Sequence, residues 1–226
     1  MRYRQIVFDV DGTLVDTEQA VICSLQDTLA QMTGQRAEAK ELTFALGIPG
    51  EDALRLLQVR DIPAALALWD QRMEAYRDMI RVFEGVEELL RDLQAAGYGL
   101  GVVTSKTREE FAHDLAGFEI VQYFDCVVCA DDTVRHKPDS EPLLYYLEQT
   151  GCQGDELLYI GDSVYDRQCA AGAGTAFGLA GWGAQPGVSA PLIFSTPQQA
   201  AQILIGEDME QRGPARRRFL RAGPPV

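Results

Sequence analysis

The sequence is poor in basic residues and histidine, and it has no long apolar run. Its 226 residues include only 2 histidines and 20 lysines and arginines, against 34 aspartates and glutamates, so the formal net charge is −14 and the pI is about 4.5. Nucleic acids and anionic membranes are bound mainly through basic contacts to phosphates. We therefore expect neither a nucleic acid nor a membrane surface as a partner.

The apolar segments do not fit export or membrane insertion. The first of them, residues 6–8, is stopped by Asp9 and Asp11, so it does not resemble a signal peptide. Residues 168–206 carry no charged side chain, but they are rich in Gly, Ala, Gln and Pro rather than continuously apolar, as a membrane span would be. The sequence predicts a cytoplasmic protein.

Disulfide pairing and a cysteine zinc site are both disfavoured. The five cysteines are odd in number and scattered, and without an export signal we expect free thiols in a reducing compartment. Cys126 and Cys129 form a C-x-x-C in an apolar run, but no second pair completes a zinc site. A spacing of three on a strand puts them on opposite faces, so we interpret both as packing residues.

The most informative segment is DVDGTLVDT, residues 9–17, which follows the apolar run 6–8. The pattern predicts a buried strand that delivers Asp9 and Asp11 to its carboxyl end and then turns sharply. Two carboxylates on the same side of a strand end repel unless a cation lies between them or they share a proton. A calcium-binding EF-hand loop does not fit, because Ala20 stands at the twelfth position, where that loop has glutamate.

Short apolar runs alternate with helical patterns, which favours a parallel sheet wrapped by helices. Residues 17–82 show only helical patterning, and they are too many for one crossover, so they predict a separate helical cap. We expect a core from 1–15 and 83–206, a cap from 16–82 with a loop at 46–50 placed to reach the active site, and a loosely ordered, arginine-rich tail from 207–226. The expected strands are 6–10, 100–104, 126–129, 157–160, 175–179 and 192–194, and the expected core helices lie near 86–96, 107–116, 139–150, 164–171 and 197–205.

Four segments in the same order resemble the motifs of the haloacid dehalogenase-like phosphohydrolases. The nonapeptide at 9–17 is similar to the first motif, and the strand that ends in Thr104 and Ser105 is similar to the second. Lys137-Pro138 resembles the third motif, and GDSVYD at 161–166 resembles the fourth. The resemblance covers residues 6 to about 205 and implies a Rossmann-like, doubly wound parallel sheet core with an inserted helical-bundle cap domain.

The resemblance also implies roles for the motif residues. Asp9 would be the nucleophile that forms an aspartyl-phosphate, and Asp11 would protonate the leaving alcohol and then activate water. Lys137, Thr104 and Ser105 would bind the phosphoryl oxygens. His113 and His136 have no metal-ligand partner nearby in the sequence, and we interpret both as non-catalytic.

A magnesium ion is implied as the cofactor, because this ion prefers oxygen ligands. Its expected ligands are the Asp9 carboxylate, the Asp11 backbone carbonyl and the Asp162 carboxylate. Asp166 would lie behind them, where it would orient a metal-bound water or the lysine.

The implied function is a magnesium-dependent phosphatase acting on small phosphorylated metabolites, most similar to phosphoglycolate phosphatases and related pyrophosphatases. A sugar phosphomutase stays an alternative, although mutases of this type have a histidine in the first cap helix and residues 17–29 contain none. A non-enzymatic module that binds a phosphorylated ligand is a further alternative. We expect a monomer or a weak homodimer, and the sequence does not name the substrate.

Overall fold

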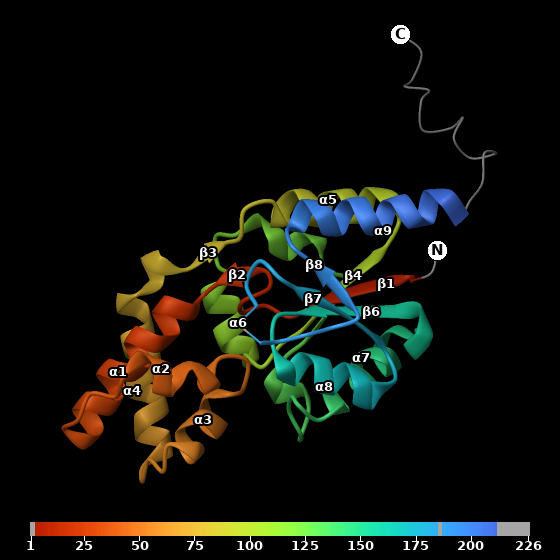
Figure 1. Cartoon of the computed structure of the whole chain (residues 1–226). Coiled ribbons are helices and arrows are strands. Elements are labelled where there is room, and N and C mark those ends of the chain that lie inside the picture. The colour runs from red at the N-terminus through yellow and green to blue at the C-terminus, as the bar shows by residue number, and fades with distance from the viewer. Residues whose placement is uncertain (1–2, 185–186, 212–226) are drawn as a thin grey trace.

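The computed structural model describes residues 3–184 and 187–211, which form a parallel α/β core with an inserted helical cap (Figure 1). The sheet of the core has the strand order β5-β4-β1-β6-β7-β8, and every pairing in it is parallel. The doubly wound parallel sheet predicted from the sequence is therefore confirmed. Its strands are β1 (Gln5–Phe8), β4 (Gly99–Val103), β5 (Cys126–Val128), β6 (Leu157–Gly161), β7 (Ala176–Ala180) and β8 (Leu192–Phe194).

Helices cover both faces of this sheet, which explains why its strands are continuous apolar runs. In Figure 1, α5 (Val86–Ala96) and α9 (Pro197–Gln211) lie together on one face, and α7 (Glu141–Thr150) and α8 (Val164–Ala173) lie on the other. Successive residues of a strand alternate between the two faces. Along β1, Ile6 and Phe8 belong to the core cluster under α5 and α9, whereas Val7 belongs to the cluster under α7 and α8.

The central strand β1 pairs with β4 on one side and β6 on the other, so the order of strands reverses there. In open α/β sheets, ligands bind beside the carboxyl ends of the strands at such a reversal. The segments after β1, β4 and β6 all meet at this edge. Helix α6 (Arg108–Asp114) lies near this edge. The remaining elements of the core are the short helices η3 (Glu119–Tyr123), η4 (Ala130–Asp132) and η5 (Gly154–Glu156).

The cap is inserted between two short strands, β2 (Val15–Asp16) and β3 (Arg81–Val82), which pair antiparallel. We expected no strand within 17–82, and β3 corrects this, because two residues are too few to show an alternating pattern. The cap has its own apolar cluster, in which the Trp69 Nε1–H donates to Ser24 Oγ at 2.9 Å. Its elements are α1 (Glu18–Thr33), α2 (Ala39–Leu42), η1 (Thr43–Ala45), α3 (Gly50–Leu56), α4 (Ile62–Ala75) and η2 (Arg77–Met79).

The fold also bears on the two cysteines of the C-x-x-C segment, on the C-terminal residues and on the lack of a membrane span expected from the sequence. Cys129 packs in one core cluster and Cys126 against the other, so the two lie on opposite faces as predicted. Helix α9 continues to Gln211, so residues 207–211 of the expected tail are helical, and 212–226 lie outside the described residues. Among the described residues, no helix is both long and apolar enough to cross a membrane.

Candidate active site

Three buried carboxylates meet at the carboxyl edge of the sheet. Asp9 follows β1, Asp162 follows β6, and Asp166 lies in the first turn of α8. One oxygen from each lies within 4.8 Å of the other two, and the three residues are 1%, 7% and 0% exposed. The sequence thus correctly predicted that residues separated by about 150 positions share one edge of the sheet.

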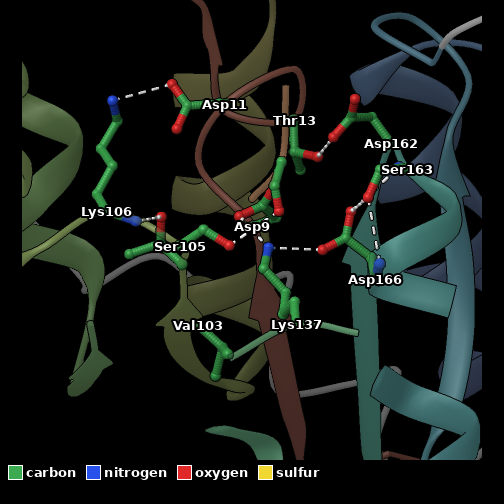
Figure 2. A network of polar contacts seen from close by, with 12 residues as sticks. Asp9, Asp11, Thr13, Val103, Ser105, Lys106, Lys137, Asp162, Ser163 and Asp166 are labelled. Carbon is green, nitrogen blue, oxygen red and sulfur yellow. Dashed lines mark hydrogen bonds and ion pairs between the residues drawn. The ribbon is translucent and has the colours of Figure 1, made fainter. Parts of the chain in front are cut away.

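Lys137 neutralises part of this negative charge. Its Nζ lies 2.8 Å from Asp9 Oδ1 and 2.7 Å from Asp166 Oδ1, and Figure 2 shows the lysine between the two carboxylates. The ammonium also donates to the Tyr159 hydroxyl at 3.2 Å. Burial alone lowers the pKa of Lys137, but the charges of Asp166 and Asp9 outweigh burial and raise its pKa above the ordinary value. Lys137 is therefore a fixed cation.

The three carboxylates differ in how many of their oxygens are occupied. Asp166 is saturated, because Oδ1 accepts from Lys137 and Oδ2 accepts from the Ser163 backbone N–H at 3.1 Å and from the Ser163 hydroxyl. In contrast, among the described residues Asp9 Oδ2 is buried without a hydrogen-bond partner, and Asp162 Oδ1 accepts only from Thr13 Oγ1, at 3.4 Å. Asp9 and Asp162 therefore have oxygens available for a ligand.

The electrostatics of these two acids call for a cation. Burial raises the pKa of Asp9 to about 7, with Lys137 opposing the shift and Asp166 and Asp11 adding to it. The pKa of Asp162 is also raised well above its usual range, first by burial and then by the charges of Asp166 and Asp9. An all-oxygen set with an unpartnered buried oxygen fits a hard divalent cation. The acidic cluster can thus hold such a metal.

Gly12 lets the loop after β1 approach Asp162 closely. Its φ is +75°, which favours glycine, and a Cβ built on it would lie 2.4 Å from Asp162 Oδ2. No side chain fits at this position unless the carboxylate moves. The glycine of the DVDGT segment therefore sets the position of an acid from a distant strand.

Asp11 is held apart from the three-carboxylate cluster by contacts of its own. Its Oδ1 accepts from Thr17 Oγ1 at 2.6 Å and lies 3.1 Å from Lys106 Nζ (Figure 2). Lys106 is 8% exposed, and its Nζ also donates to Asp114 Oδ2 at 2.7 Å. Burial alone would lower the pKa of Lys106, but Asp11 and Asp114 reverse this and raise it.

Sequence reasoning missed Lys106. Only three lysines occur in the chain, and two of them, Lys106 and Lys137, are buried at this edge of the sheet, whereas Lys40 is exposed. The position directly after Ser105, at the end of β4, was the available signal. Nothing local distinguished it from a surface lysine, because its partners Asp11 and Asp114 come from other segments.

The second-motif residues link the core to the cap. Thr104 is 3% exposed, and its Oγ1 accepts from the Lys106 backbone N–H at 3.2 Å. Ser105 Oγ donates to the Gly47 carbonyl at 2.9 Å. Gly47 belongs to the cap loop at 46–50, so the prediction that this loop reaches the site is confirmed.

A cavity of about 410 Å³ lies between the core and the cap. Asp9, Asp11, Ser105 and Lys106 line it from the core. His113 also lines it, with Nε2 2.9 Å from Glu74 Oε2. Its expected non-catalytic character stays a prediction, as does that of His136. The cap contributes mainly apolar side chains: Val21, Leu46, Ile48, Leu66, Trp69 and Met73.

The fold and the site define an α/β enzyme with an acidic, metal-compatible centre under a helical cap. The chain matches the family model of the haloacid dehalogenase-like hydrolases over residues 6–180, and it belongs to that family. It is a phosphatase.

Relatives with this architecture carry two kinds of name. The chain is 34% identical over 187 residues to the "putative pyrophosphatase PpaX" of Caldanaerobacter subterraneus subsp. tengcongensis, covering 82% of this chain and 85% of that protein. It is 31% identical over 182 residues to the pyrophosphatase PpaX of Bacillus velezensis, covering 80% and 84%. A crystal structure of a "putative phosphoglycolate phosphatase" from Lactobacillus plantarum superposes with a TM-score of 0.81 at 30% identity, covering 90% of this chain and all of that one.

Proposed function

We propose that this phosphatase hydrolyses phosphate monoesters of small metabolites through an aspartyl-phosphate on Asp9. The observation that carries the proposal is the unpartnered Oδ2 of Asp9, a buried oxygen of a residue that lines the cavity. A carboxylate with one oxygen fixed by Lys137 and the other free is oriented to attack phosphorus.

The proposed reaction has two steps. Asp9 attacks the phosphorus, the ester P–O bond breaks, and Asp11 gives its proton to the leaving alkoxide. Water then attacks the phosphorus of the aspartyl-phosphate, Asp11 takes the proton, and inorganic phosphate leaves as Asp9 is restored. The Thr17 and Lys106 contacts hold Asp11 in place for both proton transfers.

The remaining residues neutralise charge on the phosphoryl group. Lys137 faces it as a buried cation, and the Thr104 hydroxyl and the Ser105 backbone N–H donate hydrogen bonds to its oxygens. Asp9, Asp162 and the Asp11 backbone carbonyl would hold magnesium, which supplies Lewis-acid stabilisation of the developing charge. Asp166 orients Lys137 from behind.

Three other functions remain as alternatives. Pyrophosphate hydrolysis is favoured by the names of the relatives, which are similar over four fifths of the chain. A phosphomutase is disfavoured because α1, the first cap helix, contains no histidine. A purely binding role is disfavoured by the cost of burying three carboxylates around one lysine without a metal.

The test of the proposed function is a time course with purified protein and magnesium on a panel of phosphate monoesters, sugar phosphates and pyrophosphate. We expect release of inorganic phosphate from monoesters, with no isomerised sugar phosphate. Isomer formation that outpaces phosphate release would overturn the hydrolase in favour of the mutase, and turnover restricted to pyrophosphate would favour a pyrophosphatase.

Metal affinity should depend on Asp162 far more than on Asp166. Asp162→Asn removes an available ligand, so we expect magnesium affinity to fall by at least about 100-fold, against about 10-fold for Asp166→Asn, which changes a residue behind the metal. Calorimetric titration with Mg²⁺ alone measures both, and excess EDTA should abolish turnover of the native protein. Equal losses in the two variants would contradict this ligand assignment.

Gly12→Ala should disable the site with little loss of stability. The added Cβ displaces the Asp162 carboxylate, so we expect turnover to fall by at least about 100-fold, as for a catalytic group moved by about 1 Å. Gly34→Ala is a matched control, because Gly34 has φ +76° with nothing within 4 Å of an added Cβ. Both variants should lose a similar, small amount of stability in urea, while Gly34→Ala keeps full activity. Comparable turnover in the two variants would contradict the role of this close approach.

A further inference from the structure

The cavity that Asp9 lines also has an apolar wall, built from the cap. Two of its residues, Leu46 and Ile48, come from the cap loop. The other three come from helix α4: Leu66, Trp69 and Met73. The polar edge of the Trp69 ring is already satisfied by Ser24, so the rest of the ring offers only carbon. This wall suits methylene groups of a leaving group rather than a densely charged one.

The rim of the same cavity carries three carboxylates that form no direct ion pair with a basic side chain of the described residues. Asp70, from the cap, and Glu109 and Glu110, from α6, all line the cavity. In the part of the chain that the structure describes, neither the Asp70 nor the Glu109 carboxylate has a hydrogen bond or ion pair, although both residues lie in helices. Glu110 Oε2 accepts only from the backbone N–H and the hydroxyl of Thr107, which carry no charge.

The two basic groups of the cavity are engaged elsewhere. Lys106 lies between Asp11 and Asp114, and the His113 ring lies between Glu74 and Asp114, at 2.9 and 3.2 Å. Burial raises the pKa of Asp70, and the nearby charges of Glu110, Glu109 and Asp114 raise it further, while His113 opposes the shift. The cap and the core therefore face each other with like charges across the cavity.

From this arrangement we infer that the substrate is a phosphate monoester whose leaving group carries a protonated amine on a short apolar stem. The phosphate would lie at Asp9, whose free Oδ2 belongs to the same cavity, the stem would lie along Leu66 and Trp69, and the ammonium would lie among Asp70, Glu109 and Glu110. This inference rests on the proposed function and names its substrate class. Leaving groups that are anionic, such as a second phosphate or a carboxylate, would meet repulsion at the rim.

A binding series tests the inference without relying on turnover. We would titrate the full chain, with magnesium present, with butylphosphonate, 3-aminopropylphosphonate and 3-carboxypropylphosphonate, which differ in the charge of the terminal group. We expect the amine to bind about tenfold more tightly than the neutral compound, as two or three partly exposed ion pairs allow, and the carboxylate to bind more weakly still. The differences should shrink between 0.05 and 0.5 M salt, because exposed charges are screened.

Variants of the rim provide the controls. Asp70→Asn and Glu109→Gln should each reduce the preference for the amine over the neutral compound by several-fold, and Asp70→Lys should invert the order of amine and carboxylate. Glu88→Gln removes an exposed carboxylate from α5, outside the cavity, and should leave the order unchanged. Equal affinities for the three phosphonates in the native protein would overturn the inference. Preference for the carboxylate that grows with added magnesium would also overturn it, since the rim would then hold a second metal.

Turnover separates this inference from the function on which it rests. Hydrolysis of aminoalkyl and hydroxyalkyl phosphates at equal kcat/KM, together with equal phosphonate affinities, would leave the phosphatase standing and remove the amine preference. If the phosphonate affinities follow the expected order but no ester is hydrolysed, the amine preference would stand and the phosphatase function would be contradicted.

Discussion

Asp9→Asn is expected to reduce phosphate release by at least about 10⁴-fold, because the amide keeps the shape of the carboxylate but cannot form the aspartyl-phosphate. The measurement is phosphate release from the best monoester of the panel under single-turnover conditions. Acid-quenched native protein should carry phosphate on Asp9, and the variant should carry none. Residual activity within tenfold of the native value would contradict the role of Asp9 as nucleophile.

The same variant carries a pH signature in stability. The folded-state pKa of Asp9 is raised to about 7, above the ordinary carboxyl value of 3.8, so the folded protein binds a proton that the unfolded chain releases. In EDTA, this residue therefore destabilises the native protein above pH 7 and ceases to do so as the pH falls toward 4. Urea midpoints at pH 8 and pH 5 should show a larger gain in the native protein than in Asp9→Asn, because Asp162, whose pKa is also raised, contributes to the gain in both proteins. A gain of the same size in both proteins would show that another group causes it.

How much of this site follows from the sequence depends on the kind of contact that builds it. Asp9 and Asp162 could be placed together, because parallel strands bring their carboxyl ends to one edge and each residue follows an apolar run. Lys137 follows no such run, and only the resemblance of Lys137-Pro138 to the third family motif placed it in the site. The grouping of Asp9, Asp162 and Asp166 needs no knowledge of side-chain packing. The roles proposed for them still await the experiments above.

Lys106 shows what sequence patterns leave out. Its two ion-pair partners are Asp11, which is 95 positions away, and Asp114, which is the last residue of α6. Neither spacing produces a periodic signal. Whether a lysine is buried depends on where opposite charges lie in the tertiary structure. The local sequence around residue 106 carries no information about those positions.

The two short strands at the edges of the cap and the end of α9 escaped prediction for different physical reasons. Strands β2 and β3 are two residues long, below the length at which alternation can be read. Residues 207–211, by contrast, lack an apolar face, and this absence suggested a tail. Their sequence, EDMEQ, nevertheless consists largely of good helix formers, which extend a helix already begun by packing.

Lys137→Met is the substitution expected to cost the most stability. The lysine side chain is 1% exposed and lies within 2.8 Å of two carboxylates that are themselves buried. Removing one member of such a group leaves uncompensated buried charge, which costs about 3–5 kcal/mol. Urea denaturation in EDTA at pH 8 measures the loss, and Lys40→Met, at an exposed lysine, should change stability by less than about 0.5 kcal/mol.

The stability lost in Lys137→Met should also depend on pH. The direction of this dependence follows from the pKa values of Lys137 and Asp9. The raised pKa of Lys137 means that its stabilisation is complete below the ordinary lysine value of 10.5 and disappears only as the pH rises through the higher folded-state value. Between pH 8 and pH 5 the lysine itself therefore contributes no pH dependence. Asp9, however, takes up a proton over that interval, and a neutral Asp9 no longer needs a cation, so the deficit of the variant should shrink at pH 5. A deficit that stays constant from pH 8 to pH 5 would mean that Lys137 stabilises the fold by packing its methylenes and not by its charge.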